Sequence, residues 1–350
     1  MQKLFASLAL ATLLAGCATG TKPADPIDTL MQRYSGDVPG AALLVLKDGK
    51  PVIRRTYGLS NLEDGDKTRT DTNYRLASIS KQFTAAAILL LAESGRLTLD
   101  DSVRYWLPSL PEANTAVTLR QLLTHTGGLI DYEDLIPAGT TGQVSDSDVL
   151  RMVAGSDRTY FEPGTAYRYS NTGYVLLGLV VERASGMSLP LFLQQQIFQP
   201  LGMDHTLLYE RGRSEVDRRA YGYSELRGNW TRTDQSVTSA TRGDGGIYSS
   251  IDDLAKWDAA LYDNRLLSDA SRQLAFSAHV QVTGEPYQAG YGYGWRITGD
   301  TVWHSGESIG FRNVIVRWPK QHLTVILLSN RNDPEPYHTA LAIAQPYLQP

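Results

Sequence analysis

Residues 77–91 read ASISKQFTAAAILLL, a serine and a lysine three positions apart followed by a run of Ala, Ile and Leu. So apolar a run predicts a helix in the protein core. Ser78 and Lys81 then share one helix face, because side chains at i and i+3 are neighbours. Beside apolar residues the lysine loses hydration, which favours its neutral form and lets it take the proton of the serine hydroxyl. The pair is a candidate activated nucleophile, although a helix-capping serine and a solvated lysine explain the same spacing.

Composition places the chain among globular proteins and excludes several functions. Its 350 residues are 42% hydrophobic and 20% charged, enough for one large domain or two ordinary ones. The net charge of −4 argues against nucleic acid or a polybasic membrane contact as a partner. The six histidines show no pair at ligand spacing and Cys17 is the only cysteine, so we expect no metal and no cofactor. The oligomeric state stays open.

The N-terminus has the layout of an export signal over residues 1–16. Lys3 precedes an apolar run over residues 4–14 that is too short to span a bilayer. The run ends in Leu-Ala-Gly-Cys, residues 14–17, which resembles the bacterial lipobox, where the cysteine is acylated; an ordinary signal peptide with a chance cysteine is the alternative. Residues 17–25 are small and polar and suit a flexible tether. We therefore expect a lipid anchor at Cys17 as the only membrane contact, in the bacterial cell envelope, on the periplasmic face of the outer membrane in a Gram-negative cell.

Secondary-structure patterns place strands at both ends of the chain. Asp48-Gly49 joins two predicted strands, residues 41–47 and 51–57, in a hairpin. Later strands are predicted over 292–298, 301–304, 313–318 and 323–329, and helices over 26–34, 119–123, 145–153, 174–184, 190–198, 251–261 and 336–347. The simplest arrangement is an α+β domain over residues 26–350, an antiparallel sheet flanked by helices. Its α/β part covers about 26–77 plus 285–350, and a large, mostly helical insertion covers about 78–284.

Tyr169-Ser170-Asn171 lies in a glycine-flanked loop before the helix predicted from residue 174. A phenol there can exchange a proton if a nearby cation lowers its pKa, and the amide can orient the lysine or a substrate amide. Tyr262-Asp263-Asn264 has the same spacing, but it ends a predicted helix, where a cap is the natural explanation. We therefore favour Tyr169 and Asn171.

His304-Ser305-Gly306 follows a short predicted strand. At a cleft it offers an imidazole, a hydroxyl and a glycine that lets a substrate backbone come close. His125-Thr126-Gly127 repeats the pattern, but it follows a helix end and precedes Gly128, which better suits a turn.

The three motifs, in this order and spacing, resemble the active-site motifs of the serine β-lactamase and penicillin-binding-protein superfamily. The branch with class C β-lactamases, DD-carboxypeptidases, D-aminopeptidases and related esterases is the most similar. Further similarity lies in LLTHTGGL at 122–129, EPG at 162–164, GGIYSS at 245–250 and YGYGW at 291–295. The resemblance covers nearly the whole chain from Pro26 and implies the β-lactamase/transpeptidase-like fold.

The resemblance also implies roles for individual residues. Ser78 is expected to be acylated, with Lys81 and Tyr169 sharing its activation and the protonation of the leaving group. The oxyanion is expected between the backbone N–H groups of Ser78 and Glu307. Asn171 is expected to hold the lysine or the acyl amide.

Two positions match the motifs of the family less closely. Tyr132 falls loosely where the family places a polar residue lining the pocket. His304 stands where β-lactamases and many penicillin-binding proteins have lysine, and an imidazole is only partly charged near neutral pH. A substrate carboxylate is then held less firmly, which favours an esterase or peptidase acting on an ester, amide or D-amino acid peptide over an efficient β-lactamase.

Other functions stay open at this point. A β-lactamase or DD-carboxypeptidase acting on β-lactams or peptidoglycan stem peptides is one alternative, and a non-catalytic binding lipoprotein of the cell envelope is another. A pure binder needs no activated nucleophile. Finally, Gly306 to Gly310 reads Gly-Glu-Ser-Ile-Gly and matches a nucleophile elbow around Ser308, but that motif needs a following helix, and the sequence predicts a strand hairpin.

Overall fold

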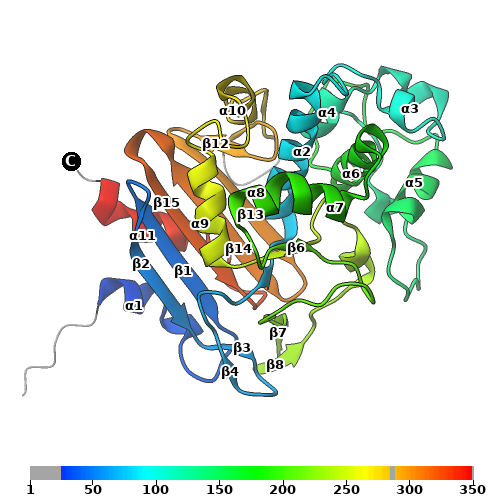
Figure 1. The fold of residues 1–350 in the computed structure, drawn as a ribbon. Helices are drawn as coiled ribbons and strands as arrows, with labels where there is room; N and C mark the ends of the chain where they lie inside the picture. Colours follow the sequence, from blue (N-terminus) through cyan, green and yellow to red (C-terminus); the bar gives the residue numbers. More distant parts are fainter. Residues whose placement is uncertain (1–24, 284–287, 349–350) are drawn as a thin grey trace, which may run out of the picture.

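The computed structural model describes residues 25–283 and 288–348 (Figure 1). The predicted signal peptide, Cys17 and the tether up to residue 24 lie outside the described residues. Within the described part, no single helix has the length and apolar character needed to cross a membrane. One bent helix pair, Asn171–Ser185 with Leu189–Leu201, passes that test jointly, by length and composition only.

An antiparallel sheet of eight strands dominates the described part of the chain, in the order β10-β11-β12-β13-β14-β15-β1-β2. Its strands are β1 (Ala41–Lys47), β2 (Lys50–Tyr57), β10 (Val280–Gln281), β11 (Gly290–Tyr291), β12 (Arg296–Thr298), β13 (Thr301–Ser308), β14 (Phe311–Trp318) and β15 (Leu323–Ser329). Strands β1 and β15 pair with Ala41 opposite Ser329, so the two ends of the chain meet within the sheet. The predicted antiparallel sheet built from both chain ends is confirmed.

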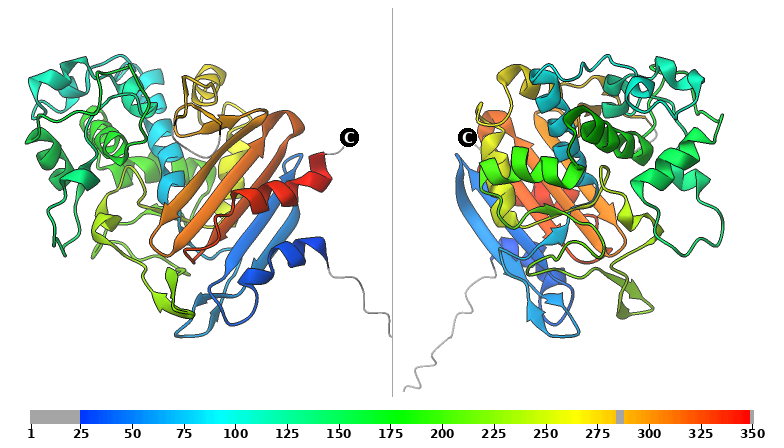
Figure 2. Two further views of the ribbon diagram at one scale, coloured as in Figure 1. Left: turned by 180° about the vertical axis from the view of Figure 1, so that it is seen from behind. Right: turned by 45° about the vertical axis from the view of Figure 1, so that its right-hand side comes forward.

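Helices cover both faces of this sheet. The helices are α1 (Pro26–Leu30), α2 (Lys81–Glu93), α3 (Val103–Trp106), α4 (Leu119–Leu123), α5 (Asp146–Ala154), α6 (Asn171–Ser185), α7 (Leu189–Leu193), α8 (Gln199–Leu201), α9 (Ile251–Ala260), α10 (Asp269–Ala275) and α11 (Tyr337–Leu348). Figure 2 shows α1 and α11 lying across one face, while the helical part stands on the other. Because both faces are covered, β15 is buried along its whole length, and its residues 325–328 are all apolar.

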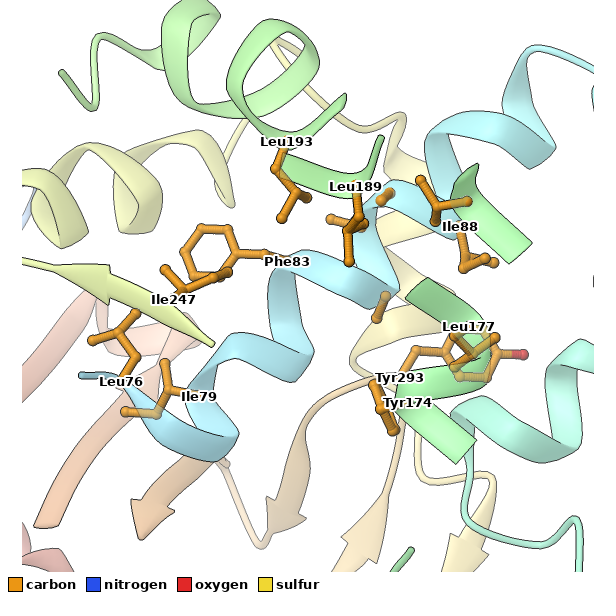
Figure 3. Close-up of a cluster of buried hydrophobic side chains, with 14 of the residues drawn as sticks. Leu76, Ile79, Phe83, Ile88, Tyr174, Leu177, Leu189, Leu193, Ile247 and Tyr293 are labelled. Carbon is orange, nitrogen blue, oxygen red and sulfur yellow. The ribbon is translucent and has the colours of Figure 1, made fainter. Parts of the chain in front are cut away.

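Helix α2 runs through the centre of the larger core. Ten of its thirteen residues are buried, which explains why its sequence shows no polar stripe. Phe83 packs against the Trp257 ring of α9 at a centroid distance of 4.4 Å. Figure 3 shows the apolar side chains around α2, contributed by α6, α7, β9 (Ile247–Ser249) and the turn before α2. The first residue of α2, Lys81, is therefore held in the protein interior, with 0% of its surface exposed.

The chain between β2 and the late strands also forms short strands that the sequence did not predict. They are β3 (Leu59–Asn61) with β4 (Asp66–Lys67), β5 (Tyr74–Arg75) and β6 (Leu207–Leu208) on either side of β9, and β7 (Tyr223–Leu226) with β8 (Asn229–Arg232). Each of them has two to four residues, too few to show an alternating pattern. The turns η2 (Ala77–Ser80), η4 (Tyr132–Leu135) and η6 (Val237–Ala240) are 3-10 helices.

Two features depart from the predicted layout. Helix α9 packs against β1 and β15, and β10 is the edge strand of the large sheet. Both elements therefore belong to the α/β part of the domain, although the sequence analysis placed their residues in the helical insertion. The strand predicted over 292–298 is interrupted before β12. Gly294 adopts φ +76, and a Cβ there would lie 2.8 Å from the Lys81 carbonyl oxygen. This close approach seats the loop after β11 on the first turn of α2.

Candidate active site

The Lys81 ammonium group is the centre of a buried hydrogen-bond cluster. Its Nζ lies 3.1 Å from Ser78 Oγ, 2.8 Å from Asn171 Oδ1 and 2.9 Å from the carbonyl oxygen of Asp244. The amide and carbonyl oxygens can only accept hydrogen bonds, so each takes one N–H of the lysine. A neutral lysine amine has two N–H bonds and one lone pair. With both N–H bonds donated to these oxygens, the lone pair faces the Ser78 hydroxyl. The arrangement therefore suits proton transfer from Ser78 to Lys81.

The turn that carries Ser78 is fixed from both sides. Leu76 donates its N–H to the Ile247 carbonyl at 2.8 Å, and Ile247 donates to Ser80 Oγ at 3.1 Å. On the other side lies β13, where a Cβ on Gly306 would fall 2.0 Å from the Leu76 carbonyl oxygen. The glycine of the third motif is thus required by the nucleophile turn itself, a reason different from the close substrate approach expected from sequence.

Tyr169 faces the lysine from the opposite wall. Lys81 Nζ lies 4.9 Å from the centroid of its ring. The Tyr169 hydroxyl is buried and has no hydrogen-bond partner among residues 25–283 and 288–348. Tyr262, the other tyrosine followed two positions later by an asparagine, packs instead against His322 and Arg317, beside the sheet. The structure brings Tyr169, and not Tyr262, to Lys81.

His125 supports the Tyr169 loop, a role that the sequence did not indicate. Its ring packs 4.3 Å from the Tyr169 ring, and its Nδ1 accepts a hydrogen bond from the backbone N–H of Ser170 at 3.1 Å. Burial, the largest cause, and the charge of Lys81 hold the pKa of His125 well below its usual range. His125 is therefore neutral and fixes the loop. The repeated histidine, hydroxyl, glycine pattern and the family-like stretch at residues 122–129 were the signals available in the sequence.

Asn171 is the first residue of α6, after the capping Ser170. Its Oδ1 accepts from Lys81, while its Nδ2 donates to Glu133 Oε1 at 2.9 Å. Of the two roles expected for Asn171, this geometry shows the contact with the lysine. It also adds an exposed carboxylate, Glu133, next to the cluster.

Tyr132 does not line the site in this structure. Its side chain is 0% exposed, and its hydroxyl lies 3.4 Å from Thr241 Oγ1 in the core. The following residue, Glu133, reaches Asn171 instead. The residue of this turn that reaches the site is therefore Glu133, one position after the expected Tyr132, because the 3-10 turn η4 directs adjacent side chains to different sides.

His304 is fully buried on β13. Its Nδ1 lies 2.6 Å from the Ser305 carbonyl oxygen, and its Nε2 lies 3.0 Å from the Tyr291 hydroxyl. Because a carbonyl only accepts, Nδ1 carries the proton and Nε2 accepts from the tyrosine. Burial is the main cause that holds the pKa of His304 well below its usual range, with Arg296 and Lys81 lowering it further. His304 is therefore neutral, and the third motif provides no cation.

The remaining residues of the third motif lie along the nucleophile turn. Ser305 is partly exposed on β13, and Glu307 follows Gly306, whose backbone touches the turn at Leu76. The Glu307 carboxylate forms an ion pair with Arg312 at 2.6 Å. Ser308 ends β13 and is followed by the Gly310 turn and β14, so it sits in a hairpin and lacks the strand-to-helix turn of a nucleophile elbow.

These features define a serine hydrolase of the β-lactamase class, and comparison with known proteins agrees. The family model described as Beta-lactamase matches residues 25–346. The chain therefore belongs to the β-lactamase family. It is 35% identical to penicillin-binding protein 4* of Bacillus subtilis over 325 residues, 87% of this chain and 71% of that protein. It is 30% identical to Protein flp of Staphylococcus aureus, covering 87% of this chain and 62% of that protein, less than two thirds of its length.

Solved structures show the same fold. The octameric penicillin-binding protein homologue from Pyrococcus abyssi aligns with a TM-score of 0.79 and 28% identity, over 91% of this chain and 75% of that chain. The D-amino acid amidase from Ochrobactrum anthropi aligns with a TM-score of 0.78 over 92% of this chain and 99% of that one. Its identity of 22% is a likeness of fold alone.

Proposed function

We propose that the chain hydrolyses its substrate through a covalent acyl-enzyme on Ser78. The observation that carries this proposal is the direction of the Lys81 amine. Two fixed acceptors take two of its N–H bonds, so that its third position points at the Ser78 hydroxyl 3.1 Å away. A serine beside a buried amine is the arrangement that nucleophilic catalysis requires.

The steps follow from this geometry. Ser78 Oγ attacks the carbonyl carbon of the substrate while Lys81 takes the hydroxyl proton. The oxyanion is stabilised by the backbone N–H groups of Ser78 and Glu307, the pair that the family resemblance implies. The unpartnered Tyr169 hydroxyl donates its proton to the leaving group as the scissile bond breaks, and recovers a proton through Lys81. Water then attacks the acyl-enzyme with the same groups in reversed roles. The product acid leaves, and Ser78 regains its hydrogen.

The charges around the cluster favour an ester or amide whose acyl part carries an ammonium group. The Glu133 carboxylate is exposed and touches Asn171, which in turn contacts Lys81. A carboxylate at this position attracts a cation, and the α-ammonium of an amino acid amide is such a group. Because His304 is neutral, the third motif does not offer the charge that a β-lactam carboxylate needs. We therefore propose amino acid amides, esters and peptides as the preferred substrates, and we take their D configuration from the D-aminopeptidase branch that the motifs resemble.

Neutralising Glu133 tests this assignment of substrate. Glu133→Gln keeps the acceptor for Asn171 but removes the charge, so we expect KM for a D-amino acid p-nitroanilide to rise about tenfold. The KM for p-nitrophenyl acetate, which has no ammonium group, stays unchanged. Asp134→Asn is the matched control, since Asp134 lies on the same turn but contacts Tyr160. Equal effects of Glu133→Gln on both substrates would rule out ammonium recognition.

A second candidate, a carboxypeptidase acting on D-Ala-D-Ala peptides, is favoured by Arg296. Its guanidinium lies 5.7 Å from the Tyr169 ring centroid and 5.9 Å from that of Tyr291. It is a permanent cation next to the motif where His304 has none. Its positive charge would attract the terminal carboxylate of such a peptide.

One panel separates the candidates. Purified enzyme is assayed with p-nitrophenyl esters, D- and L-amino acid p-nitroanilides, a D-Ala-D-Ala peptide and nitrocefin. Our proposal predicts ester and D-amino acid anilide turnover, with nitrocefin turned over slowest. Fast release of D-alanine with no anilide turnover would replace the first candidate by the second. Fast nitrocefin turnover would identify a β-lactamase.

We further propose that the enzyme works in the cell envelope, tethered by a lipid on Cys17. The support is the Leu-Ala-Gly-Cys end of the apolar N-terminal run. Expressed in a Gram-negative host, the full chain is expected in the membrane fraction and Cys17→Ser in the soluble fraction. Equal partition of both proteins would contradict a lipid anchor.

A further inference from the structure

Asp131 lies where the turn η4 meets the start of α6, next to the proposed active site. It is the residue before η4, and its Oδ1 accepts a hydrogen bond from the backbone N–H of Glu133 at 3.2 Å. Its Oδ2 accepts from the backbone N–H of Asn171 at 2.7 Å and, less closely, from that of Thr172 at 3.5 Å. The two oxygens of one carboxylate therefore hold two segments that are 40 residues apart in the sequence.

A carboxylate suits the start of α6. The first N–H groups of a helix have no partner within the helix, and the helix dipole favours negative charge there. Asn171 is the first of the fifteen residues of α6. The capping Ser170 accepts from the N–H of Gly173, at 3.4 Å. The N–H of Asn171 therefore takes its partner from outside the helix, and that partner is Asp131.

A second hydrogen bond joins the same two segments. The backbone N–H of Tyr132 donates to Thr172 Oγ1 at 2.7 Å, and both residues are 0% exposed. Each of the residues 131, 132 and 133 thus contacts one of the first two residues of α6. Asp131 is bonded to the backbone of both segments, so it fixes where each of them begins.

The junction of η4 with α6 carries two side chains that the proposed function uses. Asn171 Oδ1 accepts from Lys81 Nζ at 2.8 Å, and Asn171 Nδ2 donates to Glu133 Oε1 at 2.9 Å. Because the lysine donates to this amide, the amide oxygen faces the lysine and the NH2 group is left for the carboxylate. Asp131 thus holds, by their backbone N–H groups, the residue that contacts the base and the carboxylate proposed to attract the substrate ammonium group.

We propose that Asp131 is a positioning residue that fixes Asn171 and Glu133 against each other, and that it thereby governs both the acylation rate and the selectivity for a substrate with an ammonium group. This inference rests on the proposed function, in which Lys81 is the base and Glu133 attracts the ammonium group. Such positioning has a large effect on rate, since a displacement of about 1 Å in an active site can cost about 10²-fold.

Asp131→Asn tests the inference with two substrates, p-nitrophenyl acetate and a D-amino acid p-nitroanilide. Asparagine keeps the size of the side chain, but one of its two polar atoms is an NH2 group, which cannot accept from a backbone N–H. We expect kcat for both substrates to fall about tenfold through Asn171, the effect of one lost hydrogen bond to a charged group. We expect KM to rise about fivefold for the anilide and to stay unchanged for the ester, because only the anilide carries the ammonium group that Glu133 attracts.

The separation of KM from kcat distinguishes positioning from stability. A protein that is only destabilised contains fewer active molecules, which lowers kcat but leaves both KM values unchanged. Equal effects of Asp131→Asn on the KM values of the two substrates would therefore count against the inference.

Double variants trace the effects to the two neighbours. If Asp131 acts through Asn171, then Asp131→Asn costs little further activity in an Asn171→Ala background. If it acts through Glu133, the rise in KM for the anilide is absent when Glu133→Gln is already present. Additive losses in either background, or wild-type kinetics of Asp131→Asn alone, would overturn the inference.

Asp148→Asn is the matched control. Asp148 is a carboxylate in the first turn of another helix, α5, where its Oδ2 accepts from the backbone N–H of Ser145 at 2.9 Å and its Oδ1 accepts from Arg151 at 2.7 Å. The control variant is expected to keep the kcat and KM of the wild type. A loss as large as that of Asp131→Asn would show that the removal of any carboxylate at a helix start has this effect, against the inference.

Folding and labelling separate this inference from the proposed function. If Asp131→Asn does not fold, Asp131→Ser, which retains one acceptor oxygen for the start of α6, carries the same prediction, and failure of both to fold would show a structural role instead. Fluorophosphonate labelling of Ser78 in the wild type is measured in parallel. Absent labelling overturns the proposed function, whereas normal labelling with unchanged kinetics of the Asp131 variant overturns only the role of Asp131. If the wild type hydrolyses the ester but not the anilide, the ammonium assignment fails, and the Asn171→Ala background, assayed with the ester, still decides the role of Asp131.

Discussion

Replacing Ser78 by alanine is expected to lower kcat/KM for the best substrate by at least about 10⁴-fold, because no other group can form the acyl-enzyme. The fold is expected to survive, since within residues 25–283 and 288–348 the Ser78 hydroxyl forms one side-chain hydrogen bond, with Lys81. The measurement is steady-state hydrolysis of a p-nitrophenyl ester, with the melting temperature as the check on folding.

Ser308→Ala is the matched control for this substitution. Ser308 belongs to the Gly-Glu-Ser-Ile-Gly sequence that resembles a nucleophile elbow, and its hydroxyl is buried at the end of β13. We expect the variant to keep its activity within a few-fold of the wild type. Loss of activity in Ser308→Ala with activity retained in Ser78→Ala would reverse the assignment of the nucleophile.

Replacing Lys81 by methionine is expected to lower kcat on the order of 10³-fold, the usual contribution of a positioned general base. Methionine fills the space of the lysine stem, but it leaves the Asn171 and Asp244 oxygens without their donor. We therefore also expect a lower melting temperature, by a few degrees. Stopped-flow measurement of acylation and thermal unfolding give the two values separately.

Lys256→Met is the control, because Lys256 is a lysine on α9 whose partner is Asp253. It is expected to leave kcat unchanged. A Lys81→Met variant that acylates at the wild-type rate would assign the base role to Tyr169 alone, and the same assay on Tyr169→Phe would then show the larger loss.

The sequence predicted the parts of the fold whose pattern is local. Helix α2 was recognisable because nearly all of its residues are buried, and the β1–β2 hairpin because Asp48-Gly49 suits a tight turn. The short strands β5, β6 and β9 were not predictable, since two or three residues carry no periodicity and their pairing depends on the tertiary fold. The break before β12 was missed for a similar reason: Gly294 is needed where the chain meets α2, a contact that local sequence does not reveal.

The residues of the candidate site likewise divide into those that the sequence predicted and those that it did not. Ser78, Lys81, Tyr169 and Asn171 were predictable because the order of their motifs along the chain resembles that of a known family. Asp244 was not, because it binds Lys81 through its backbone carbonyl, which every residue has.

Two further site residues escaped prediction for geometric reasons. His125 was assigned to a turn, and it does occupy one, with φ 58, but the turn directs its ring onto Tyr169. Glu133 was missed because the sequence pointed to its neighbour Tyr132, and the geometry of the 3-10 turn decides which of two adjacent side chains reaches the site. Both cases depend on backbone direction, which residue type alone does not fix.

The most direct measurement of the central claim is the mass of the intact enzyme after exposure to a fluorophosphonate, followed by peptide mapping. The account predicts one adduct per chain, located on Ser78, absent in Ser78→Ala and formed far more slowly in Lys81→Met. An adduct on Ser308, or continued ester hydrolysis by an enzyme that carries no adduct, would contradict it.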